Sequence, residues 1–155
     1  MSADRNSKSS EAGTSAKPRA EQNVLFVCIG NACRSQMAEG FANHGGAGRV
    51  RAWSAGSMPL GMIAEGTEAV MAEKGIFLEG HFSKGVNEVP LKKMDVIVTM
   101  GCGMPCPTFP GFRGRKVEWE IPDPYGHSLK YFRQVRDLLE GQVRALLETL
   151  PAQVP

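Results

Sequence analysis

Two short, uninterrupted apolar runs limit most strongly what this chain can fold into: "NVLFVC" at 23–28 and "MDVIVTM" at 94–100. Both are rich in β-branched side chains, and neither alternates between apolar and polar residues as a strand with one solvated face does. Such runs are typical of strands buried on both faces, which occur in parallel sheets that helices cover. The sequence therefore predicts an α/β fold built on a parallel sheet.

Helical patterns separate the expected strands along the chain. Ser35 is a suitable residue to start a helix, and Gly75 is a suitable residue to end one. The other expected elements are helices at 36–44, 63–74 and 128–150, a strand at 48–56 and a weaker edge strand at 115–121. This alternation predicts one α/β domain with right-handed crossovers.

Length and composition set the domain boundaries. The chain has 155 residues, of which 42% are hydrophobic and 22% charged, and this suits a single domain with a substantial core. Residues 1–22 hold almost no large apolar side chain, so they cannot offset the entropy lost on ordering. We predict a disordered N-terminal tail over 1–22 and a folded catalytic domain over 23–150.

Charge and hydropathy exclude several classes of partner. Eighteen basic residues against sixteen acidic ones give a net charge of +2, and no stretch combines basic residues with aromatic ones as a nucleic-acid surface would. No apolar run reaches the roughly 18 residues of a membrane span, and the first residues lack the apolar core of a signal peptide. We therefore expect a cytoplasmic protein that binds neither nucleic acid nor membrane.

The cysteines need an explanation in such a compartment, because cytoplasmic thiols are kept reduced and structural disulfides are uncommon there. The sequence points to catalysis, redox chemistry or metal binding by Cys28, Cys33, Cys102 and Cys106. Their C-x4-C and C-x3-C spacings could make a four-thiolate zinc site. Arg34 argues against zinc, and Cys33 is most simply a small residue that fills the back of the loop.

The loop after the first strand has the composition of an anion site. In an open parallel sheet, ligands bind beyond the carboxyl ends of the strands, where this loop begins. Five residues separate Cys28 from Arg34, enough for backbone N–H groups to surround a tetrahedral oxyanion, and the next helix points its N-terminus at the same spot. The expected oxyanion-binding residues are Ile29, Gly30, Asn31, Ala32, Cys33 and Arg34.

The chemistry of this loop centres on Cys28. Arg34 can hold two oxygens of the anion, and both its charge and the helix N-terminus favour a thiolate at Cys28. In a simpler interpretation, a buried cysteine ends a strand and the arginine is a solvated side chain. The preceding strand, the following helix and Ser35, which can donate a hydrogen bond to the thiolate, favour a nucleophile beneath a bound oxyanion.

The stretch "VCIGNACRSQMAEG" at 27–40 resembles the C-x5-R-S signature of the low-molecular-weight protein tyrosine phosphatase superfamily, and within it is similar to the arsenate reductases that share the fold. The resemblance covers about residues 23–150. It implies a three-layer αβα fold with a four-stranded parallel sheet and helices on both faces. Gln36 stands where tyrosine phosphatases of the superfamily usually carry proline, which favours an arsenate reductase over the alternative, a phosphatase acting on phosphotyrosine or aryl phosphates.

The resemblance also implies the rest of the catalytic set. Superfamily members place a general acid in an Asp-Pro motif, which here is Asp123 in "IPDPYG"; without the resemblance, this is a residue of a surface turn. Reducing arsenate to arsenite takes two electrons, which Cys102 and Cys106 in "VTMGCGMPCP" can supply by forming a disulfide. We therefore expect a thiol relay from Cys28 through these two cysteines, supported by Arg34 and Ser35.

Partners and supporting residues follow from the same resemblance. We expect no tightly bound cofactor or metal, a thioredoxin-like protein or a low-molecular-weight thiol as reductant, and competition by phosphate or sulfate. Asn31 is expected to fix the shape of the loop. Glu39 and Ser54 match positions that help bind potassium in some arsenate reductases, and Lys84 falls where those proteins carry an acidic ligand. The Lys84 ammonium could replace the ion; otherwise it is a solvated surface charge.

Overall fold

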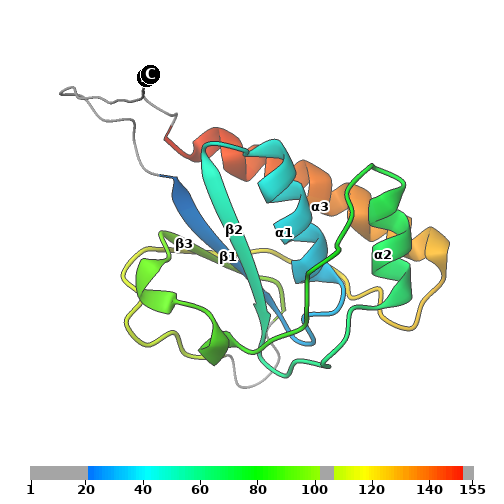
Figure 1. The fold of residues 1–155 in the computed structure, drawn as a ribbon, viewed down its shortest axis with the longest axis horizontal. Helices are drawn as coiled ribbons and strands as arrows, with labels where there is room; N and C mark the ends of the chain where they lie inside the picture. The colour runs from blue at the N-terminus through cyan, green and yellow to red at the C-terminus, as the bar shows by residue number, and fades with distance from the viewer. Residues whose placement is uncertain (1–20, 102–106, 152–155) are drawn as a thin grey trace, which may run out of the picture.

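A computed structural model describes residues 21–101 and 107–151 of the chain. Its centre is a parallel sheet of four strands in the order β2-β1-β3-β4 (Figure 1). The strands are β1 (Gln22–Cys28), β2 (Val50–Gly56), β3 (Val96–Thr99) and β4 (Arg115–Glu118). The predicted α/β fold with a four-stranded parallel sheet is therefore confirmed.

The side chains of the sheet enter two separate cores, as the alternation of side chains along a strand requires. Phe26 of β1 and Val98 of β3 belong to the larger core, which the α-helices cover. Leu25 and Ile97 point to the other face and belong to a smaller core. All four are completely buried, which explains why β1 and β3 read as continuous apolar runs.

Each face of the sheet has its own covering layer. The α-helices of the described residues contribute to the larger core: α1 (Arg34–Gly45), α2 (Glu65–Ala72) and α3 (Leu129–Thr149). The smaller core is closed by the 3-10 helices η1 (Val86–Glu88) and η2 (Leu91–Lys93) and by Phe109 and Phe112. The second helical layer is thus built from single turns, because the proline-containing stretch at 86–93 cannot continue a longer helix.

The strand order creates a switch point beside β1. The chain leaves β1 toward β2 on one side, and β3 then pairs with β1 on the other side. Met100, just after β3, donates its backbone N–H to the carbonyl of Val27 (2.8 Å), so the loops that follow β1 and β3 leave the sheet side by side. Ligand sites of open α/β sheets lie at such points. Within the described residues, no helix is both long and apolar enough to cross a bilayer.

Candidate active site

The loop between β1 and α1 is held from outside through its carbonyl groups. The carbonyls of Cys28, Ile29 and Gly30 accept the backbone N–H groups of Ser57, Met58 and Leu60 at 2.8–3.0 Å. Further along, the Ala32 carbonyl accepts the Thr67 hydroxyl (2.8 Å) and the Ala64 N–H (3.1 Å), and the Ser83 hydroxyl donates to Gly30 (3.1 Å). These bonds fix the loop from the chain between β2 and β3.

The opposite side of this loop carries its backbone donors. Within the described part of the chain, the N–H groups from Gly30 to Ser35 donate to no protein acceptor. Asn31 has a φ of 50°, in the left-handed region that asparagine tolerates better than most residues, and this reverses the direction of the chain in mid-loop. Unpaired N–H groups at a helix N-terminus form an anion-binding concavity.

A glycine on β2 lets the loop lie against the sheet. A Cβ atom at Gly56 would lie 2.5 Å from the Ile29 carbonyl oxygen and 3.0 Å from the backbone nitrogen of Asn31. No other residue fits at such distances without moving the loop. Gly56 therefore supports the anion loop although it is remote from it in sequence.

Arg34 is the first residue of α1, and its side chain is buried, with only 5% of the residue exposed. Its Nη1 donates to the carbonyls of Met100 (2.7 Å) and Ile121 (3.0 Å). Its Nε is buried and has no protein partner in the described part of the chain. A buried guanidinium with a donor left over fits an anionic ligand, since an unsatisfied buried donor is otherwise unfavourable.

The sulfur of Cys28 has a short polar contact. Its Sγ lies 2.9 Å from the Ser35 hydroxyl, and that hydroxyl accepts a hydrogen bond from the Asn31 side-chain amide at 2.7 Å. Cys28 is 2% exposed, and Asn31 and Ser35 are fully buried. Since Ser35 already accepts from the amide, its own proton is free to be donated to the sulfur.

Asp123 lies on the other side of Arg34. Its Oδ2 is 3.6 Å from the Arg34 Nη2, and its side chain remains 49% exposed. The other carboxylate oxygen accepts the N–H of Tyr125 at 3.1 Å, which holds the group in a defined orientation. The structure thus brings together Cys28, Arg34, Ser35 and Asp123, as the sequence predicted for the catalytic set; their chemical roles stay predictions.

Cys33 differs from Cys28 in its surroundings. It is 3% exposed, and burial raises its pKa to about 11, although a hydrogen bond with Thr67 opposes the shift. Such a thiol stays protonated and unreactive at neutral pH. This agrees with a residue that contributes its backbone N–H to the loop and not its sulfur.

The support residues beside the loop form a polar cluster. Ser54 donates to the Glu39 Oε1 at 2.5 Å, and the Lys84 Nζ donates to the Phe82 carbonyl at 3.2 Å. Burial lowers the pKa of Lys84, and the charges of Glu39 and Glu88 oppose the shift. An ammonium among these carboxylates would repel a potassium ion, so the residues present do not fit that ion. That Lys84 takes its place stays a prediction.

Cys102 and Cys106 lie outside the described residues. The chain that leads to them is described, and it passes the anion loop, because a Cβ at Gly101 would lie 3.1 Å from the Arg34 Nη1. Of the described cysteines, Cys28 and Cys33 are free. Over 21–101 and 107–151, no three acidic, histidine or cysteine side chains group as metal ligands would.

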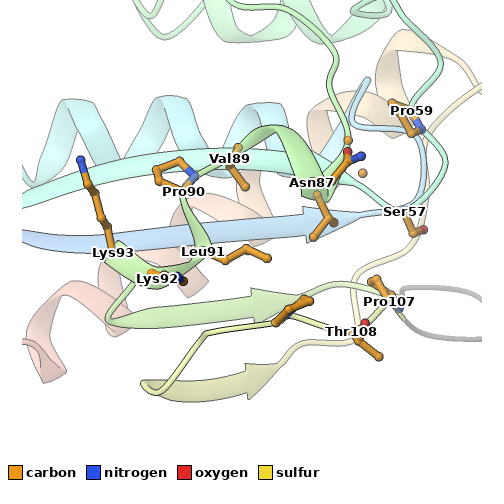
Figure 2. Close-up of a pocket in the computed structure, with 14 residues that line it drawn as sticks. Ser57, Pro59, Asn87, Val89, Pro90, Leu91, Lys92, Lys93, Pro107 and Thr108 are labelled. Atoms are coloured by element: carbon orange, nitrogen blue, oxygen red, sulfur yellow. The ribbon is translucent and has the colours of Figure 1, made fainter.

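A cavity of about 920 Å³ lies on the other side of the sheet from the α-helices. Figure 2 shows Leu91 and Lys92 from the η2 segment on one side of it and Pro107 and Thr108 on the other. It shares Ser57 with the outer support of the anion loop, but neither Cys28 nor Arg34 lines it. The described residues that line it include no cysteine and no arginine, so we place the site at the loop and not in this cavity.

A parallel α/β sheet with a cysteine, five loop residues and an arginine at its switch point defines a cysteine-dependent, phosphatase-like protein. The model of one family, low molecular weight phosphotyrosine protein phosphatase, matches residues 23–105 and 108–155. The chain belongs to this family.

Several of the similar proteins are named arsenate reductases. The chain is 37% identical over 136 residues to the glutaredoxin arsenate reductase of Synechocystis, covering 86% of this chain and 98% of that protein. A solved arsenate reductase in a phosphate-binding state is 33% identical, with a TM-score of 0.74, over 84% of this chain and 99% of the other. A thioredoxin-dependent arsenate reductase of Corynebacterium glutamicum is 29% identical, with a TM-score of 0.68, over 83% of this chain and 60% of its own.

Several supporting residues were not found from the sequence. Thr67 and Ser83 hold loop carbonyls, and Gly56 makes room for the loop, yet all three are common residue types with no motif around them. Gln36 was noted only for its place in the motif, whereas it contacts the loop, the Phe82 carbonyl and His81. Only the folded chain brings these segments together.

Proposed function

We propose that the protein reduces arsenate to arsenite. The observation that carries this proposal is the position of Arg34, which directly follows the anion loop in the chain and donates to the carbonyl of Met100, just before the segment that holds Cys102. A hydrolytic phosphatase needs the loop and an acid, but it does not need a pair of thiols at the end of the neighbouring strand. The arsenate reductases among the similar proteins support the same conclusion.

The first step is attack on arsenic. The Cys28 thiolate adds to arsenate held by the loop N–H groups and Arg34, and one As–O bond breaks. Asp123 supplies the proton with which that oxygen leaves as water, since a carboxyl at the mouth of the site can act as a general acid. The product is an arsenic(V) adduct bound to sulfur.

The second step reduces the arsenic. The Cys102 thiolate attacks Cys28, and the electron pair of the S–As bond stays on arsenic, which leaves as arsenite. Cys106 then attacks Cys102 and frees Cys28, so that two thiols end as one Cys102–Cys106 disulfide. The two electrons gained by arsenic equal the two lost by the thiols.

The reductant of this disulfide is a thiol. The names of the related proteins mention both glutaredoxin and thioredoxin, which supports a thiol-containing protein as the electron donor. We propose a thioredoxin-like donor. Turnover with thioredoxin and its reductase should exceed turnover with glutathione and glutaredoxin when both systems are supplied at equal reducing capacity.

The proposed function is tested by measuring arsenite formed from arsenate and, in parallel, the hydrolysis of an aryl phosphate. We expect arsenite formation to need a thiol reductant and to be inhibited competitively by phosphate. Efficient phosphate hydrolysis with no arsenite formed would identify a phosphatase instead and refute the proposal.

A further inference from the structure

One edge of the sheet has no neighbouring strand. β4 pairs with β3 on one side, and no described strand pairs with its other side. Arg115 and Trp119 donate their backbone N–H groups to carbonyls of the β3 segment, each at 2.9 Å. Because the hydrogen-bonding direction alternates along a strand, the N–H and carbonyl groups of Lys116 and Glu118 face outward. Over residues 21–101 and 107–151, these outward groups have no partner.

The β4 edge is open to solvent, whereas the β2 edge is closed. Three of the four residues of β4 are exposed, and Val117 is only partly buried, so the covering layers leave this strand accessible. At the other edge, the side-chain amide of Asn43 accepts the backbone N–H of Ala52 at 2.8 Å and donates to its carbonyl at 3.2 Å. Open strand edges are templates for pairing with another chain. Such pairing is therefore available at β4.

The charges along β4 are complementary to the charges of a second, antiparallel β4. Lys116 and Glu118 lie on the same face of the strand, and the Lys116 Nζ lies 5.7 Å from the centre of the Phe109 ring. With Val117 opposite its own copy, Lys116 lies opposite Glu118 at both symmetric positions. Charges on an edge usually prevent pairing, and a register shifted by two residues would indeed place Lys116 opposite Lys116 or Glu118 opposite Glu118.

The other face of β4 and its backbone favour the same register. Val117 and Trp119 pack against the larger core, and Arg115 shares their face because side chains alternate along a strand. The register places Arg115 opposite Trp119, where a guanidinium can lie over an indole ring. It also places Lys116 and Glu118, which carry the outward backbone groups, directly opposite each other. An antiparallel pair exchanges both of its N–H···O=C bonds between such residues.

We propose that the protein dimerises in solution through antiparallel pairing of β4 with β4 of a second copy, with Val117 on the two-fold axis. The two sheets of four strands then form one continuous sheet of eight. Because the paired strands run in opposite directions, the two anion loops lie at opposite ends of this sheet and stay accessible. The interface is short, so the dimer is weak and depends on protein concentration.

Sedimentation velocity of the full-length protein tests this proposal, with a thiol reductant present to exclude disulfide-linked dimers. The dimer fraction should rise between about 10 µM and 1 mM protein, as a small interface predicts. Lys116→Glu places Glu opposite Glu twice in each dimer, and Glu118→Lys places Lys opposite Lys twice. Each should weaken dimerisation on the order of tenfold. Lys130→Glu reverses an exposed charge of α3 and, as the matched control, should leave the dimer unchanged.

A mixture of the two single variants identifies the register. Lys116→Glu and Glu118→Lys each repel themselves but complement one another, so together they should form a mixed dimer about as stable as the unmodified one. The doubly reversed variant should dimerise like the unmodified protein, and it keeps the test valid if one single variant fails to fold. A protein that stays monomeric at all concentrations, single variants that dimerise normally, or the absence of a mixed dimer would each overturn the proposal. None of these measurements uses arsenate, so the outcome is independent of the reductase activity.

Discussion

At the scale of single residues, the geometry of Arg34 cannot be reproduced by another cation. Its Nη1 donates to two backbone carbonyls, which leaves Nε and Nη2 for the anion and for Asp123. Lysine has a single nitrogen and cannot serve both the carbonyls and an oxyanion. For Arg34→Lys we expect phosphate affinity to fall by on the order of tenfold and kcat/KM by on the order of a hundredfold.

Titration calorimetry with phosphate and arsenite formation measure these two losses. Arg144→Lys changes an exposed arginine of α3 in the same way and serves as the matched control, which should lose neither. Near-normal turnover of Arg34→Lys would mean that this side chain does not hold the substrate.

The raised pKa of Cys33 predicts how the unfolding free energy of the protein changes with pH. Its folded pKa of about 11 lies above the ordinary value of 9.0, so its contribution to stability is complete below pH 9 and is lost as the pH rises toward 11. The unfolded protein ionises this thiol first, and that favours unfolding. The difference in unfolding free energy between the unmodified protein and Cys33→Ala should therefore shrink between pH 9 and pH 11, by up to about 3 kcal/mol.

Urea unfolding at several pH values measures this difference. Subtracting the variant removes the contributions of all other titrating groups, because they are common to both proteins. A difference that stays constant from pH 8 to pH 11 would mean that the Cys33 thiol is not desolvated in the folded protein.

The functional residues of the loop motif could be predicted from the sequence, but the residues from other segments that support them could not. Cys28, Arg34 and Ser35 belong to one short motif, so a single loop of the chain is enough to bring their side chains together. Glu39 and Ser54 come from α1 and β2, and their 2.5 Å bond depends on how the helix packs on the strand. The contact of Gln36 with His81 joins residues 45 positions apart and has no local signal.

At the scale of helices and strands, the apolar patterns located the elements, but some predicted elements extend beyond the observed ones. The long helix expected at 128–150 is observed as Leu129–Thr149, and Ser128 caps it by accepting the Tyr131 N–H. The helix expected at 63–74 is shorter, Glu65–Ala72, because residues before it bond to the anion loop. The strand expected at 115–121 ends at Glu118. The carbonyl of Ile121 lies beyond this end and accepts a hydrogen bond from the Arg34 Nη1.

The end of β2 offers a test of how the sheet supports the loop. Gly56→Ala places a methyl group 2.5 Å from the Ile29 carbonyl oxygen, so the loop must move. We expect a loss of about 1–3 kcal/mol in unfolding free energy and weaker phosphate binding. Gly141→Ala in α3 meets nothing within 4 Å and should instead gain up to about 1 kcal/mol.

Thermal unfolding with and without phosphate checks both variants. The stabilisation that phosphate gives should shrink in Gly56→Ala and stay unchanged in Gly141→Ala. An unchanged phosphate response in Gly56→Ala would show that the anion loop does not depend on this contact.

At the scale of the whole molecule, the strand order brings the parts of the proposed reaction together. β1 and β3 are separated by 67 residues along the chain, from the end of one at Cys28 to the start of the other at Val96, yet they pair directly. The alternation of elements predicted a parallel sheet but did not by itself give this order. The proposed relay from Cys28 to Cys102 and Cys106 depends on this order.

Substituting Cys102 or Cys106 should stop the proposed reaction at different steps. Cys102→Ser removes the group that attacks Cys28, so we expect no arsenite beyond the background supplied by external thiols. Cys106→Ser leaves that attack intact and should release one equivalent of arsenite while a Cys28–Cys102 disulfide accumulates. Mass spectrometry of unreduced single-turnover products identifies the disulfides. Full multiple turnover of Cys106→Ser with thioredoxin would exclude Cys106 from the relay.

The bonding of the loop carbonyls to the chain between β2 and β3 also has a consequence for how the site distinguishes between anions. The inward N–H groups are held in place before any ligand arrives, and they respond to the shape and charge of a tetrahedral anion, which arsenate and phosphate share. Discrimination between the two then lies in the reaction, because thiols reduce arsenate and leave phosphate unchanged. We therefore expect the rate of arsenate reduction to depend on the ratio of arsenate to phosphate, and a lower phosphate concentration to raise that rate at a constant amount of protein.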